Sequence, residues 1–273
     1  MYFPSMTNWM IYALAGLSLV FGFGSLITFG VFLYTGSFSL VALSLDATQV
    51  LMFDACLCLA FILQHSGMIR VHARKEILGK NFAVAFSMAS GIVLFSLVAL
   101  WQESPFLIAS ADGFFRGLLR AIFFLGIAGQ IWSSMSLTSA IDPFGVQGLM
   151  ARIEPTTGID SDADTDEDAD KDASTDPAPA TLALATGAYA WVRHPAYSTM
   201  LLLLWSHPDL TADRLLLNVV FTVWVIVGTI LEERGLVEAF GEDYRAYQRT
   251  VPMLIPYRRP KCSNDCAKDG SSG

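Results

Sequence analysis

Charged residues are scarce in this sequence. Only 15% of its 273 residues are charged, whereas a soluble domain carries about 25%, and residues 1–45 contain none. Its four cysteines form no disulfide framework, because Cys56 and Cys58 lie in an apolar run and Cys262 and Cys266 in a polar tail. A hydrophobic fraction of 53% also argues against a disordered chain and against a nucleic-acid-binding protein.

Long apolar segments are what the sequence has instead. They occupy residues 9–33, 48–63, 82–101, 121–141 and 215–231. Crossing a bilayer takes about 20 apolar residues, so these segments predict an all-α integral-membrane helical bundle with about five transmembrane helices. We expect four of the helices within 1–141, a loop at 142–186, a helical hairpin with an interfacial helix at 187–257, and a polar tail at 258–273.

The basic residues predict the orientation in the membrane. The connection between the second and third segments carries four of them: Arg70, Arg74, Lys75 and Lys80. The preceding connection carries only Asp46. The positive-inside rule therefore places the second connection in the cytoplasm, together with residues 142–193 and the C-terminus. This predicts a protein of the cytoplasmic membrane whose active site faces the cytoplasm.

The formal charge of −8 comes from one acidic insert. Residues 154–176 hold ten acids and one base, so the rest of the chain sums to about +1. The low-complexity stretch at 158–180 is predicted to be a disordered loop. An EF-hand beginning at Asp162 would need Gly and Glu where Glu167 and Ala173 stand, so we predict no metal site.

Charged and aromatic residues flank a predicted hairpin near the C-terminus. Residues 198–205 extend only about 12 Å as a helix, too short to cross the membrane, and a polar turn at 207–209 follows them. The chain then returns through residues 215–231. Such a hairpin brings its two ends together, and each end carries charged or aromatic side chains: Arg193, His194 and Tyr197 at one, Glu232 and Glu233 at the other.

These motifs resemble a known family. Arg193-His194-Pro195-x-Tyr197 is followed 35 positions later by Glu232-Glu233, then by Gly241-x-x-Tyr244-x-x-Tyr247 and a Val-Pro-x-x-Ile-Pro ending at 251–256. The pattern resembles the integral-membrane methyltransferases typified by isoprenylcysteine carboxyl methyltransferase, which include phospholipid methyltransferases and NnrU-type proteins. Asp54 with residues 64–70 and 141–149 is similar to the methanethiol S-methyltransferase branch, which makes dimethyl sulfide. One departure is Ser198-Thr199, near where the family often has glycine.

The resemblance implies S-adenosylmethionine as cofactor and a small thiol as substrate. We expect Glu232 and Glu233 to bind ribose or ammonium, and Tyr197 and Tyr247 to line the cofactor. The full set of expected cofactor-binding residues is Tyr189, Val192, Arg193, His194, Pro195, Tyr197, Glu232, Glu233 and Tyr247. The C-terminal stretch places Leu236, Phe240, Tyr244 and Tyr247 on one predicted helical face, either against the membrane surface or as a lid.

A thiol must lose its proton before it attacks, because the thiolate is the nucleophile. His194 and His65 are the candidate proton acceptors. Asp54 shares a helical face with His65, since eleven residues make about three full turns. A carboxylate inside an apolar span is a functional candidate, so the catalytic candidates are His194, His65 and Asp54. The alternative for His65 and Asp54 is helix packing.

Two other functions remain open from the sequence. One is methylation of an isoprenylcysteine carboxylate or of a phospholipid amine. The other is a non-catalytic, NnrU-type membrane accessory protein. The expected partners are the lipid bilayer and a small thiol, without nucleic acid, and the sequence makes no prediction of oligomeric state.

Overall fold

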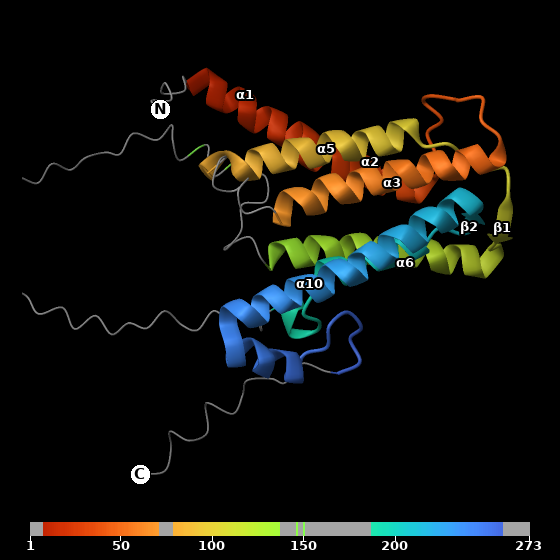
Figure 1. Ribbon diagram of the computed structural model, residues 1–273. Coiled ribbons are helices and arrows are strands. Elements are labelled where there is room, and N and C mark those ends of the chain that lie inside the picture. Colours follow the sequence, from red (N-terminus) through yellow and green to blue (C-terminus); the bar gives the residue numbers. More distant parts are fainter. Residues whose placement is uncertain (1–7, 71–78, 137–145, 147–149, 151–186, 259–273) are drawn as a thin grey trace, which may run out of the picture. The chain divides into compact units, whose positions relative to one another are not determined.

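The computed structural model describes residues 8–70, 79–136, 146, 150 and 187–258. It forms two compact units, the first Met1–Ser104 with Ile141–Ala178 and the second Pro105–Ala140 with Pro179–Gly273. Within the described residues, five helices are long and apolar enough to cross a membrane, which confirms the predicted all-α membrane fold (Figure 1). The predicted acidic insert at 158–180 lies outside the described residues.

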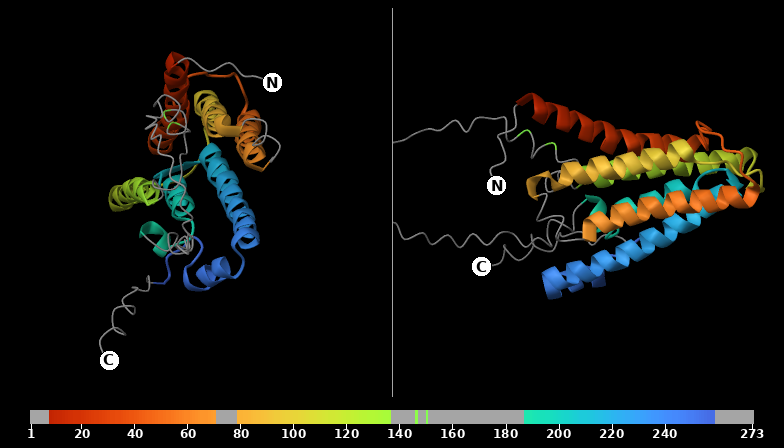
Figure 2. Two further views of the ribbon diagram at one scale, coloured as in Figure 1. Left: turned by 90° about the vertical axis from the view of Figure 1, so that its left-hand side faces the viewer. Right: turned by 45° about the horizontal axis from the view of Figure 1, so that its top comes forward.

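The first unit holds three of the five candidate spans. Its elements are α1 (Asn8–Ser18), η1 (Leu19–Phe23), α2 (Gly24–Thr35), α3 (Ala47–Arg70), η2 (Gly79–Asn81) and α5 (Phe82–Leu100). The elements from α1 to α2 form one continuous span, Asn8–Thr35. Helix α5 packs against this span and against α3, beside which it lies in Figures 1 and 2.

A close backbone approach holds α5 against η1. A Cβ added to Gly91 would lie 1.9 Å from the carbonyl oxygen of Phe21 and 3.1 Å from the nitrogen of Gly22, so only glycine fits there. Small residues at such crossings let membrane helices pack closely. Gly16 and Gly30, by contrast, have no described atom within 4 Å of an added Cβ.

The second unit contains the predicted hairpin. Its elements are β1 (Leu107–Ser110), α6 (Gly113–Met135), η3 (Gly187–Ala190), α9 (Pro195–Trp205), β2 (Asp209–Thr211) and α10 (Ala212–Thr250). Helix α9 contacts both α6 and α10, and the left view of Figure 2 shows it between them. The indole of Trp205 donates a hydrogen bond to Thr222 Oγ1 at 3.0 Å, joining the two arms of the hairpin.

Two glycines of α6 allow the close contact with α9. A Cβ on Gly126 would lie 2.8 Å from Leu203, and one on Gly129 would lie 2.5 Å from Thr199. The hydroxyl of Thr199 also donates to Gln130 Oε1 at 2.6 Å. The sequence grouped the fourth span with the first three, whereas in the structure α6 belongs to the same unit as the hairpin.

The fourth span begins earlier than the sequence suggested. We expected residues 121–141, but α6 runs from Gly113 to Met135. The predicted segment was the uncharged stretch, and the helix extends beyond it toward the N-terminus, past Arg120 and Arg116. In the structure Arg116 donates to both carboxylate oxygens of Asp209, at 3.0 and 2.6 Å, and Ser110 adds a hydrogen bond to the same carboxylate. A paired charge is tolerated at a span end, so the helix includes it.

Helix α10 also departs from the expected pattern. Gly241 has φ 56° and ψ −129°, which breaks the helix, and Figure 1 shows the chain turning back at this end. Tyr244 and Tyr247 are therefore buried, while Phe240 is exposed. The prediction that Leu236, Phe240, Tyr244 and Tyr247 share one face was wrong, because a face continues only through an unbroken helix.

We predict that Gly91→Ala destabilises the protein by about 1–3 kcal/mol, since the added methyl group meets backbone that has no room to move. Denaturant unfolding in detergent measures the change. Gly16→Ala is the matched control and should range from neutral to about 1 kcal/mol more stable, because alanine favours helix. Equal stabilities of the two variants would contradict the close approach at Gly91.

Candidate active site

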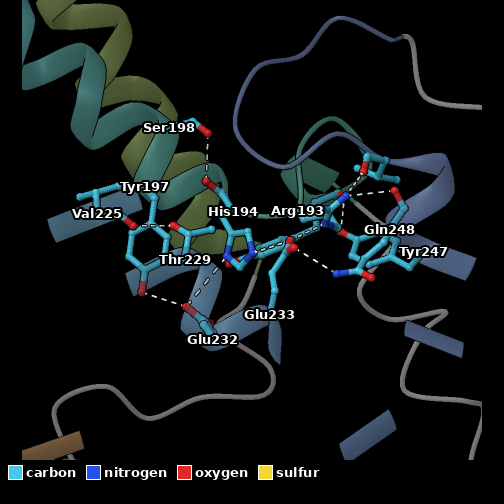
Figure 3. A network of polar contacts seen from close by, with 12 residues as sticks. Arg193, His194, Tyr197, Ser198, Val225, Thr229, Glu232, Glu233, Tyr247 and Gln248 are labelled. Carbon is cyan, nitrogen blue, oxygen red and sulfur yellow. Dashed lines mark hydrogen bonds and ion pairs between the residues drawn. The ribbon is translucent and has the colours of Figure 1, made fainter. Parts of the chain in front are cut away.

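The two ends of the hairpin meet around a set of polar side chains (Figure 3). Arg193 and His194 immediately precede α9, whose first turn contains Pro195. Proline suits this position because its fixed φ matches a helix and its missing N–H is not needed there. Glu232 and Glu233 lie on α10, after its apolar part. The convergence predicted from the sequence is therefore present in the structure.

Both carboxylate oxygens of Glu233 are engaged by side chains from two segments, residues 193–194 and Gln248. Its Oε1 accepts from Arg193 Nε at 2.6 Å and contacts His194 Nε2 at 3.2 Å. Its Oε2 accepts from the side-chain amide of Gln248 at 3.0 Å. The side chains of Arg193 and Glu233 are only 9% and 13% exposed, so this ion pair is largely withdrawn from water.

Glu232 has a more open environment. The hydroxyl of Tyr197 donates to its Oε2 at 3.0 Å, and His194 Nδ1 lies 3.9 Å from the same oxygen. Its side chain is 47% exposed, and Oε1 has no hydrogen-bonding partner among the described residues. The imidazole of His194 lies nearly parallel to the Tyr197 ring, with the centroids 5.7 Å apart.

Residues 247–255 form a segment that we call the C-terminal strap, and its backbone carbonyls hold the start of α9. The N–H groups of Arg193 and His194 donate to the carbonyls of Pro252 and Met253 at 2.9 and 3.1 Å. Ser198 Oγ donates to Leu254 O at 2.7 Å. The strap therefore fixes the backbone on which the site is built.

The Arg193 side chain strengthens the same attachment. Its Nη1 donates to the carbonyls of Gln248 and Val251. The hydroxyl of Tyr247 donates to Tyr189 O at 2.7 Å. Sequence reasoning used the ending at 251–256 for resemblance but missed Gln248 and the strap. Pro252 within the strap and Pro256 directly after it were the available signal, because proline disfavours helix and so indicated an extended segment.

Two phenols beside Glu232 retain their protons. Burial, and then the Glu232 carboxylate, raise the pKa of Tyr197 well above the ordinary value. Burial also raises the pKa of Tyr189, with a smaller contribution from Glu232. Both hydroxyls therefore remain donors at neutral pH, which suits them to bind a carboxylate or a polar ligand.

Asp54 and His65 lie in the first unit. Asp54 is fully buried on α3, and its Oδ1 accepts from the backbone N–H of Gln102 at 3.1 Å. His65 lies between Phe61 and Phe86, with ring centroids 5.4 and 4.9 Å away. Eleven residues of helix separate Asp54 and His65 by about 16 Å, so they do not form a hydrogen-bonded pair. Their catalytic roles stay predictions.

The remaining expected residues, Val192 and Pro195, are buried beside His194. They contribute shape rather than polar groups, because neither side chain carries one.

Comparison with known proteins decides the family. The chain is 31% identical over 223 residues to a methanethiol S-methyltransferase of Crocosphaera subtropica, and the match covers 76% of this chain and 75% of that protein. The chain belongs to the methanethiol S-methyltransferase family. The branch predicted from the motifs is confirmed. A methyltransferase requires a methyl donor, and the residues around Glu232 are the candidates for binding it.

Further relatives agree. A methanethiol S-methyltransferase of Pseudomonas deceptionensis is 29% identical over 214 residues, covering 77% of this chain and 74% of that protein. Methanethiol S-methyltransferase 1 of Bradyrhizobium diazoefficiens is 46% identical over 71 residues, about a quarter of each chain. No protein-family model matches the chain, and no solved structure matches it.

We predict that Arg193→Lys lowers stability by about 1–3 kcal/mol, because one ammonium group cannot replace a guanidinium that bonds a carboxylate and two carbonyls. Denaturant unfolding measures the loss. Arg249→Lys, at an arginine whose side chain is 67% exposed, should change stability by less than about 0.5 kcal/mol. A fully stable Arg193→Lys variant would show that the strap does not depend on this side chain.

We also predict that Tyr197 ionises only above about pH 10, where an ordinary tyrosine is half ionised. A raised pKa means that the phenol keeps its proton as pH rises through the usual range. Ultraviolet titration of the unsubstituted protein and of Tyr197→Phe isolates this group by difference. Half ionisation at about pH 10 would contradict the burial of this phenol next to a carboxylate.

Proposed function

We propose that this protein is an S-adenosylmethionine-dependent thiol S-methyltransferase of the membrane, which methylates methanethiol to dimethyl sulfide. One observation carries the proposal. In a chain of this family, the hairpin brings Arg193, His194 and Tyr197 into contact with Glu232 and Glu233. The relatives named above supply the substrate class.

The groups at the site fit the chemistry of the proposed donor. When bound, S-adenosylmethionine supplies a methyl group carried on a positively charged sulfur. A carboxylate suits its ammonium group and ribose hydroxyls, and Glu232 has one oxygen open to such a ligand among the described residues. The ring of Tyr197 suits a cation, worth about 0.5–2 kcal/mol. The backbone of residues 189–195 lies directly before Tyr197 and is the proposed wall of the donor site.

Nine residues are assigned to donor binding in this proposal, either by contact or by shaping the site. They are Tyr189, Val192, Arg193, His194, Pro195, Tyr197, Glu232, Glu233 and Tyr247. Seven of them form hydrogen bonds or close polar contacts with one another, and Val192 and Pro195 are buried beside them. Holding donor and thiol in line contributes several kcal/mol to catalysis, about 7–11 kcal/mol at best.

His194 is the proposed proton acceptor. Its Nε2 contacts the Glu233 carboxylate at 3.2 Å, which favours a proton on that nitrogen. Nδ1 then keeps its lone pair and lies 3.9 Å from Oε2 of Glu232, whose side chain is half exposed. With donor and thiol bound, Nδ1 would take the thiol proton, and the resulting thiolate sulfur would accept the methyl group that the donor supplies. His65 and Asp54 are the second candidates.

The site is proposed to face the cytoplasm. The four basic residues between the second and third spans favour this orientation through the positive-inside rule, and the donor is expected on the same side. A phosphatase or fluorescent-protein fusion at the C-terminus reports its side directly. A periplasmic C-terminus would contradict the orientation without changing the chemistry.

Incubation of membranes with methyl-labelled S-adenosylmethionine tests the substrate. Labelled dimethyl sulfide is the product expected from methanethiol. Label on an isoprenylcysteine ester or on a phospholipid amine would instead favour those acceptors. Purified protein that binds no donor and labels no acceptor would favour the accessory role.

His194→Gln should lower kcat by about 10²–10⁴, the usual contribution of a general base. The loss should shrink as pH rises, because more of the thiol is then already ionised in solution. His207→Gln is the control, since His207 lies at the far end of α9, where its Nδ1 contacts Asp209 O. If both variants lose activity equally at all pH values, His194 is not the base.

A further inference from the structure

The two adjacent glutamates of α10 have different surroundings. Glu233 has both carboxylate oxygens occupied, by Arg193, His194 and Gln248, and is 13% exposed. Glu232 is 47% exposed, and its one hydrogen bond among the described residues comes from Tyr197. Neighbouring residues on a helix point about 100° apart, so the two carboxylates point in different directions.

We propose that Glu233 is a positioning residue that fastens the C-terminal strap, and that Glu232 is the carboxylate that contacts the methyl donor. This inference rests on the proposed function and divides the roles of the two acids within it. The resemblance to the family gives both glutamates the same expected role. Their contacts separate them.

The role of Glu233 follows from what its donors hold. Arg193 bonds Glu233 and also the carbonyls of Gln248 and Val251, while the Gln248 side chain returns to Glu233. These hydrogen bonds form a closed network that joins α10, the start of α9 and the strap. A ligand reaching Glu233 would have to displace an arginine, an imidazole or an amide from a nearly buried carboxylate, which is unfavourable.

The role of Glu232 follows from its second carboxylate oxygen, Oε1. Tyr197 orients the carboxylate through Oε2, and Oε1 has no partner in the described part of the chain. An oriented, partly exposed carboxylate is able to accept hydrogen bonds from an ammonium or from ribose hydroxyls. It lies beside the imidazole that is proposed to accept the thiol proton. Donor binding and proton transfer would therefore occur next to each other.

The strap also connects the two roles. Its carbonyls of Pro252 and Met253 bond the N–H groups of Arg193 and His194, so a loosened strap moves His194. Glu233 is therefore expected to affect donor binding indirectly, through strap position. Glu232 is expected to affect it directly, with the strap unchanged.

The test compares Glu232→Gln, Glu233→Gln and the control Glu242→Gln, a matched change on the same element at an exposed acid paired with Arg245. Calorimetry in detergent gives the affinity for S-adenosylhomocysteine. Hydrogen exchange of peptides covering 190–198 and 247–257 reports the strap, and α6 peptides report global stability.

Glu232→Gln should weaken binding by about tenfold to a hundredfold with unchanged exchange, because one hydrogen bond to a charged group is lost. Glu233→Gln should raise exchange of the strap peptides by about tenfold while α6 exchange stays constant. Its affinity should fall less, and saturating S-adenosylhomocysteine should restore strap protection, because coupled sites stabilise one another. Glu242→Gln should match the unsubstituted protein.

Two results would overturn the division: unchanged affinity in Glu232→Gln, or lost affinity with unchanged strap exchange in Glu233→Gln. Should Glu233→Gln fail to fold, Gln248→Ala removes only the donor to Oε2, and its strap exchange must still rise above that of Glu242→Gln. An unsubstituted protein that binds no S-adenosylhomocysteine would contradict the proposed function and the role of Glu232 together. The exchange rates would still decide the role of Glu233.

Discussion

The Arg193–Glu233 ion pair is the interaction on which the site depends. Two charges withdrawn from water are stable only when each is fully satisfied, and here an imidazole, an amide and two carbonyls complete the set. Because these groups come from α9, α10 and the strap, satisfying the pair also fixes three backbone segments. The position of His194 is a consequence, since its own N–H is bonded to the strap.

The membrane explains why the fold supports this arrangement. Helix α9 has eleven residues, too few to cross a bilayer at 1.5 Å each, so its unsatisfied end must be closed by protein. The antiparallel pairing of β1 and β2 and the Arg116–Asp209 ion pair close that end. Gly126 and Gly129 let α6 lie close against α9. The contacts at this end of the hairpin thus support the helix whose other end carries the candidate site.

The chemistry of the site follows from unequal environments for similar groups. One glutamate is saturated and the other is open, while two phenols have a raised pKa through burial and stay neutral donors. Methyl transfer to a thiol needs a held cation, an aligned nucleophile and a place for one proton. In the proposed function, the open Glu232 carboxylate would hold the cation and the neighbouring His194 imidazole would take the proton.

The sequence by itself determined the membrane class, the approximate number of spans and the convergence of residues 193–197 with Glu232 and Glu233, because apolar length and hairpin topology are local properties. The motifs also resembled the family to which the comparison with known proteins assigned the chain. Only the tertiary structure decided that the twin acids differ, that Arg116 belongs inside a span, and that Gly241 breaks the last helix. Each of these depends on partners distant in the chain, such as Gln248 for Glu233 and Asp209 for Arg116, and pairwise contacts of that kind leave no periodic pattern in sequence.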